Sequence, residues 1–137
     1  MSKTTQNTEA EVKSYSAKIV KASKELSAKE RVMLKDTTAC TQLDDVVQLG
    51  GEKLSIKPDI YALVEVHNEK SKDKKDYQKL ILVENETGNR YVTGSDSFIR
   101  TFFDFVEEMD GEDFEILVFK KESKNYAGKG FLTCTIA

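Results

Sequence analysis

The chain has 137 residues, of which 39% are hydrophobic and 33% charged, and its formal net charge is −3. This length allows one folded domain with a real core but hardly two. No apolar run reaches the roughly 18 residues that span a bilayer, and the N-terminal MSKTTQNTEAEV lacks the apolar core of a secretory signal. We therefore expect a cytoplasmic protein that does not enter a membrane.

Residues 1–35 predict a polar N-terminus followed by a helical extension. After a capping box at Thr8 and Glu11, apolar residues recur at helical spacing at Val12, Tyr15, Ile19, Ala22 and Leu26. Ser27 and Glu30 form a second capping pair, which allows the helix to break and restart there. Residues 32–50 contain apolar positions without a clear period and close with the turn signal Gly50-Gly51.

From Leu54 onward the pattern predicts strands. Residues 60–67, 77–84 and 90–93 are rich in β-forming residues and are separated by polar turns. Residues 97–109, SFIRTFFDFVEEM, place six apolar side chains on one stripe, which predicts an amphipathic helix packed on a core. Residues 114–120 and 131–137 predict the last two strands.

This order of elements indicates a mainly β fold with helices, of the α+β class. It matches an OB-like five-stranded Greek-key barrel with a helix between strands three and four, preceded by the N-terminal helix. An open α+β sheet with one covering helix is the alternative architecture. We expect residues 36–137 to form the folded domain and residues 1–35 to form the extension.

Charge is segregated along the chain. Residues 69–79 hold five Lys against three acids, and residues 120–129 hold four Lys against one acid. Residues 96–113 hold seven acids against Arg100 alone. In an OB fold, the loops between strands one and two and between strands four and five flank the oligonucleotide-binding face. Those loops are the basic segments 68–76 and 121–130, so the hydrophobic pattern and the charge pattern predict the same surface.

The residue types in these loops suit a nucleic-acid strand. Lysines neutralise phosphates and release counterions, and tyrosine rings stack on bases of any identity. A solvated, lysine-rich hairpin with its tyrosine packed on the fold is the alternative reading of loop 121–130. The candidate nucleic-acid-binding residues are Lys70, Lys72, Lys74, Lys75, Tyr77, Tyr91, Lys120, Lys121, Lys124, Asn125, Tyr126 and Lys129.

Catalytic and metal sites are not indicated. His67 is the only histidine, which leaves no histidine cluster for a metal, and neither a phosphate-binding GxxxxGK[ST] loop nor a GxSxG nucleophile turn is present. Cys40 and Cys134 lack metal-site spacing, and we expect free thiols, with a disulfide as the alternative. We therefore expect no enzyme, no cofactor and no metal.

Residues 54–136 resemble a known family in the order of their predicted elements and in three local sequences, IYALVEVHNE, YVTGSDSF and FKKESKNYAGKGFLTCTI. This segment is similar to the small OB-fold single-stranded DNA-binding proteins of tailed phages and mobile elements of Gram-positive bacteria. The resemblance implies sequence-independent binding of single-stranded DNA in replication or recombination, in the bacterial host cytoplasm for a phage protein. The family's basic and aromatic binding residues correspond to the lysines and Tyr126 of the last hairpin and to Tyr77 and Tyr91.

The resemblance also implies replication or recombination proteins as partners, and the sequence leaves a homo-oligomer open. A hypothesis of a different class is an OB-like protein-interaction module or inhibitor. Such a protein would act through the acidic helix and bind no nucleic acid.

Overall fold

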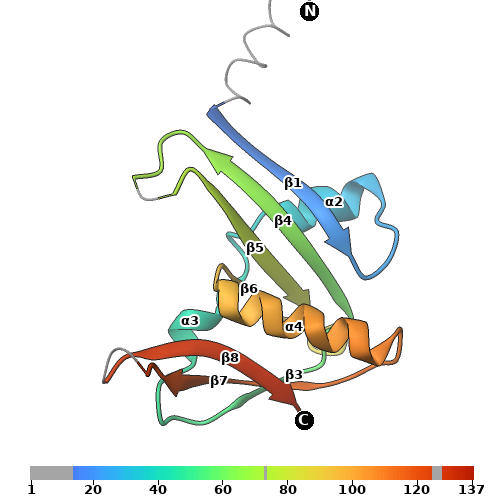
Figure 1. The fold of residues 1–137 in the computed structure, drawn as a ribbon. Helices are drawn as coiled ribbons and strands as arrows, with labels where there is room; N and C mark the ends of the chain where they lie inside the picture. Colours follow the sequence, from blue (N-terminus) through green and yellow to red (C-terminus); the bar gives the residue numbers. More distant parts are fainter. Residues whose placement is uncertain (1–13, 73, 125–127) are drawn as a thin grey trace, which may run out of the picture.

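The structure is a computed structural model, and it describes residues 14–72, 74–124 and 128–137. Figure 1 shows the arrangement of the helices and strands. In chain order they are β1 (Tyr15–Ala22), α2 (Ala28–Lys35), β2 (Thr41–Gln42), α3 (Leu43–Val46), β3 (Leu54–Ile56), β4 (Ile60–Asn68), β5 (Asp76–Val83), β6 (Arg90–Thr93), α4 (Asp96–Met109), β7 (Ile116–Glu122) and β8 (Gly130–Ile136).

The strands form two open sheets. The larger has the order β1-β4-β5-β6-β2 and is antiparallel except for the short parallel pair of β2 and β6. The smaller has the order β3-β7-β8. The predicted class, a mixed fold of strands and helices, is confirmed. The expected closed five-stranded barrel is wrong, because the described strands of the two sheets form no continuous ladder.

The two faces of the larger sheet belong to different hydrophobic cores. Alternate residues of β4 point to opposite faces, so Leu63 joins one core while Ala62 and Val64 join the other. The first core lies between the larger sheet, α4 and the smaller sheet. The second is covered by Leu26 and by Leu34 of α2. Figure 1 shows α4 crossing between the larger sheet and the β7–β8 hairpin.

The cysteines lie in these separate cores. Cys134 is buried in the first, and Cys40 packs against the second. Both thiols are free, as expected, and their positions on opposite faces of the larger sheet keep them from pairing. Burial raises the pKa of the Cys134 thiol to about 12, so it stays protonated and unreactive near neutral pH.

The predicted N-terminal helix is wrong over residues 15–22, which form strand β1 at the edge of the larger sheet. Ala17 and Ile19 face the second core with the two-residue period of a strand. A bulge then shifts the register between Ile19 and Lys21, so the next inward residue is Ala22. The bulge leaves a three-residue spacing between Ile19 and Ala22, which imitates the spacing of a helix face.

The two helix starts that involve Ser27 and Ser95 are capped by side chains. Ser27 accepts a hydrogen bond from the backbone N–H of Glu30, and the Glu30 carboxylate accepts one from Ser27 N–H, so the predicted capping box is confirmed. Ser95 caps α4, whose buried residues Phe98, Ile99 and Phe102 confirm the predicted apolar stripe. Among the described residues, no helix is long and apolar enough to cross a membrane.

Candidate nucleic-acid interface

The first predicted basic loop is the turn of the β4–β5 hairpin. Strands β4 and β5 pair from Ile60 and Val83 up to His67 and Asp76, and the Asn68 N–H donates to the Lys75 carbonyl at 2.7 Å. The turn therefore leaves the sheet at a fixed point. Its candidate lysines Lys70, Lys72, Lys74 and Lys75 are all exposed.

The lysines of this turn form two solvent-exposed ion pairs. Lys74 Nζ lies 3.9 Å from Asp96 Oδ2 at the start of α4, and Lys75 Nζ lies 3.2 Å from Glu69 Oε2. Each pair is solvent-exposed, and exposed pairs contribute little free energy. Phosphates can therefore replace these carboxylates as partners of the lysines at small cost.

His67 closes the base of the same hairpin. Its Nδ1 lies 2.6 Å from Asp76 Oδ1, and its Nε2 lies 2.6 Å from Glu69 Oε1. A protonated imidazole donates to both carboxylates, whereas a neutral one donates to only one. The hydrogen bond to Asp76, and next that to Glu69, raise the pKa of His67 above its usual 6.5. The hydrogen bond to His67, followed by that to Lys75, lowers the pKa of Glu69.

We expect the NMR titration of this single histidine to give a pKa above 6.5. Because the pKa of His67 is higher in the folded than in the unfolded state, protonated His67 stabilises the fold fully at pH values below 6.5. This stabilisation is lost as the pH rises through the pKa of the folded state. Asp76→Asn should lower the titration midpoint. Glu86→Gln, which removes a charge from the distant β5–β6 turn, should leave it unchanged. An equal shift in both variants would mean that general charge, not the contact with Asp76, sets the pKa.

The second predicted basic loop is the turn of the β7–β8 hairpin. Ser123 N–H donates to the Lys129 carbonyl at 2.8 Å, and Gly128 N–H donates to Glu122 Oε1 at 3.0 Å. Gly128 has φ 79°, a conformation that favours glycine, at the point where the chain re-enters the sheet. A side chain at Gly130 would lie 3.2 Å from Lys120 Cβ.

The candidate residues of this hairpin differ in accessibility. Lys121, Lys124 and Lys129 are exposed. Lys120 is half-buried, and its Nζ donates to the Asp44 carbonyl at 2.8 Å, so it anchors the hairpin to α3. Asn125 and Tyr126 lie outside the described residues.

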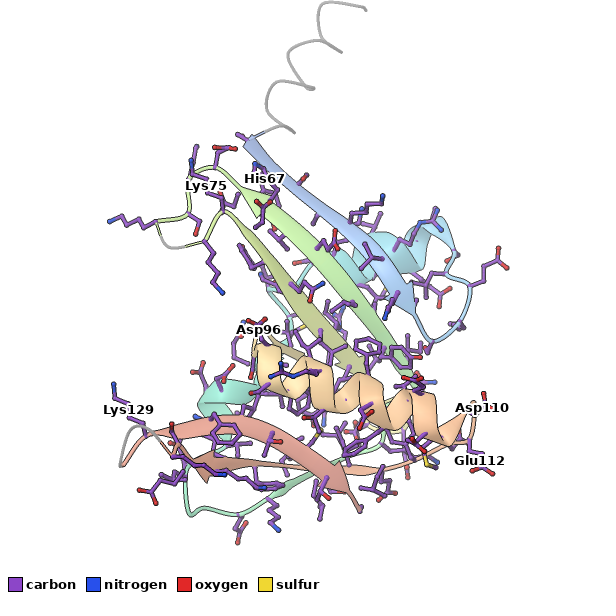
Figure 2. All side chains as sticks on the ribbon, in the orientation of Figure 1. His67, Lys75, Asp96, Asp110, Glu112 and Lys129 are labelled. Carbon is purple, nitrogen blue, oxygen red and sulfur yellow. The ribbon has the colours of Figure 1, made fainter. Side chains whose placement is uncertain are left out.

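Both hairpin turns project on the same side of the molecule, the left in Figure 1. Figure 2 places Lys75 and Lys129 on this side, with Asp96 at the start of α4 between them. Asp110 and Glu112, which follow α4, lie at the opposite side. The acidic segment 96–113 therefore starts between the two hairpins, at Asp96, and ends on the opposite side of the molecule, at Asp110 and Glu112.

Of the tyrosine candidates, the structure describes Tyr77 and Tyr91, and neither is a fully exposed ring. Tyr91 is only 7% exposed and its hydroxyl contacts Glu84 and Asn89, so the prediction of an exposed stacking ring there is wrong. Tyr77 is half-buried against the second core, and Lys79 Nζ lies 5.8 Å from its ring centroid. Tyr91 belongs to the first core, so the two rings lie on opposite faces of the larger sheet.

The structure reveals an aromatic candidate that the sequence analysis missed. Phe131 of β8 is 39% exposed and pairs directly with Lys121 of β7, on the outer face of the smaller sheet. Phe119 lies on the same face, half-buried, with Lys53 Nζ 4.8 Å from its ring centroid. Strand alternation could have found this face, because buried Val118, Leu132 and Cys134 alternate with its residues.

No protein-family model, curated protein or solved structure matches this chain. Within the described ranges, no group of three or more His, Cys, Asp and Glu side chains is placed to hold a metal ion.

Proposed function

We propose that this protein binds single-stranded DNA without sequence preference and coats it during replication or recombination. The observation that carries the proposal is the shared side of the two lysine-rich hairpins, with the exposed ring of Phe131 beside one of them. Asp110 and Glu112 lie at the opposite side, where they would repel a polyanion.

The strand order supports an OB-like interpretation of the fold. Strand β3 leads through Pro58 into β4, β4 pairs with β5, and β5 pairs with β6. After α4 the chain returns as β7, which pairs with β3. We count β3 and β4 together as the first strand, β5 as the second, β6 as the third and β7 as the fourth. The fourth strand then lies beside the first, as in a Greek key. In this interpretation the two basic hairpins are the loops that flank the binding face of an OB fold.

The chemistry of the surface favours single strands. Exposed lysines contact phosphates, which every sequence presents, and an exposed ring stacks on any base. Duplex DNA keeps its bases paired, so it offers only the phosphate contacts. We therefore expect labelled oligo(dT) to bind well above a duplex of equal length in the same buffer. Equal affinity for the two would reduce the surface to a general basic patch.

Salt dependence tests the hairpins directly. The logarithm of the binding constant should fall linearly with the logarithm of salt concentration, by about 0.7 for each phosphate contact with a single strand. Replacing Lys121 and Lys124 with alanine should reduce that slope by about 1.4 if each lysine makes one contact.

The matched control replaces Lys29 and Lys35, two exposed lysines of α2, with alanine. These substitutions change the net charge equally and should leave the slope unchanged. If the two double variants have the same salt slope, the DNA strand contacts a different surface of the protein. Absence of salt-dependent oligo(dT) binding in the unsubstituted protein would favour the protein-interaction hypothesis.

A further inference from the structure

A second surface lies between α4 and the larger sheet, and at Asp96 it reaches the first hairpin turn, where Lys74 Nζ lies 3.9 Å from the Asp96 carboxylate. It is an open groove of about 1290 Å³, with walls from β1, β4, β5 and α4. The proposed nucleic-acid interface uses none of its apolar residues.

The floor of the groove is apolar and already ordered. Leu63 and Ile99 are buried there, and Phe103 and Val106 are half-buried. The Phe103 ring packs edge-on against Tyr61, with ring centroids 5.6 Å apart. A preformed apolar cleft accommodates apolar side chains without the cost of opening it.

The rim of the groove is acidic. Its charged lining residues are four acids and two bases, namely Glu65, Asp96, Asp104, Glu107, Lys21 and Arg100. Among the described residues, the ion pairs involve none of Glu65, Asp104 and Glu107. Lys21 is already engaged, since its Nζ lies 5.0 Å from the Phe103 ring centroid. This rim repels phosphates and attracts lysine or arginine.

We propose that the groove docks a short segment of a partner protein in which apolar side chains are flanked by lysine or arginine. Helix α4 has 14 residues and is about 21 Å long, which equals about six residues of extended chain. Alternate side chains of an extended segment point the same way, so its apolar residues can enter the floor together. The basic ends then meet the carboxylates of β4 and α4. Docking here leaves the β7–β8 hairpin accessible, since none of its residues lines the groove.

The test uses a heptapeptide, Lys-Leu-Ser-Phe-Thr-Ile-Arg, titrated into the full-length chain and followed by amide NMR shifts. We expect the largest shifts at groove residues, including Leu63 and Phe103. A peptide with glutamate at both ends, and one with its apolar residues changed to serine, should each bind about tenfold more weakly or worse. Equal binding of all three peptides, or shifts confined to other surfaces, would overturn the proposal.

Variants separate the groove from general electrostatics. Asp104→Lys combined with Glu107→Lys should weaken the basic peptide at least about tenfold, because both carboxylates lie exposed on the rim. Glu112→Lys combined with Asp113→Lys changes the net charge equally at two exposed acids outside the groove, so it is the matched control and should change little. Equal weakening by both would reject the site.

Two other occupants would also overturn the proposal. Groove shifts that follow protein concentration without peptide would identify a second copy of this chain. Groove shifts caused by oligo(dT), and lost on adding the basic peptide, would identify the nucleic-acid strand.

Discussion

Replacing Phe102 with alanine is expected to lower the free energy of unfolding by about 3–5 kcal/mol, the usual cost of deleting a buried phenylalanine ring. Phe102 is 0% exposed and lies at the centre of an aromatic cluster. Its ring centroid is 5.4 Å from that of Tyr61 and 5.9 Å from that of Phe114. Because Tyr61 belongs to β4 and Phe114 precedes β7, the ring joins both sheets to α4.

Urea denaturation, followed by circular dichroism, measures this change. Phe105→Ala on the same helix is the control, since Phe105 is half-buried and forms none of the Phe102 ring contacts. It should cost clearly less than Phe102→Ala. Equal losses would mean that α4 packs with a different face, whereas a loss below about 1 kcal/mol for Phe102 would show that the cavity collapses.

Strands β4 and β5 and helix α4 could be predicted because their hydrophobic residues follow a clear strand or helix pattern. Strands β4 and β5 carry long β-forming runs, and α4 carries a wide apolar stripe between a serine cap and Gly111. These signals depend only on residues close together in the chain, so a single sequence is enough to recognise them. The capping box at Ser27 was found for the same reason.

The edges of the sheets could not be predicted in the same way. Strand β2 has two residues and β3 has three, too few to establish a period. Their pairing with β6 and β7 depends on contacts far apart in the chain. The division of the strands into two open sheets is likewise set by long-range packing, which a pattern of alternation does not contain.

For the candidate surface, the exposure of the turn lysines could be predicted from the sequence, but the exposure of the aromatic rings could not. Lysines in a polar turn are exposed wherever the turn lies, so both hairpins could be identified from sequence. A tyrosine in a strand can lie on the buried or on the exposed face of the sheet, and the register of strand pairing decides which. Tyr91 pairs with Leu82, on the face that packs against α4, and is buried. Phe131 pairs with Lys121 on the outer face of the smaller sheet.

Phe131→Ala is expected to weaken oligo(dT) binding by about 1–3 kcal/mol, the usual range for one base stacked on an aromatic ring. The salt slope should stay nearly unchanged, because stacking releases few counterions. Phe131→Tyr keeps the ring and should bind almost normally, whereas Phe131→Leu keeps apolar area without a ring and should resemble alanine. Fluorescence anisotropy at several salt concentrations measures both the affinity and the slope.

Ile136→Ala is the matched control for this experiment. Ile136 lies on the same strand, is 40% exposed against 39% for Phe131, and ends the strand far from the lysine-rich turn. Its truncation removes a similarly exposed apolar side chain and should leave the affinity unchanged. Melting temperatures of both variants separate loss of binding from loss of the fold. If Phe131→Ala binds as tightly as Ile136→Ala while both remain folded, the outer face of the smaller sheet carries no stacked base, and the lysines act alone.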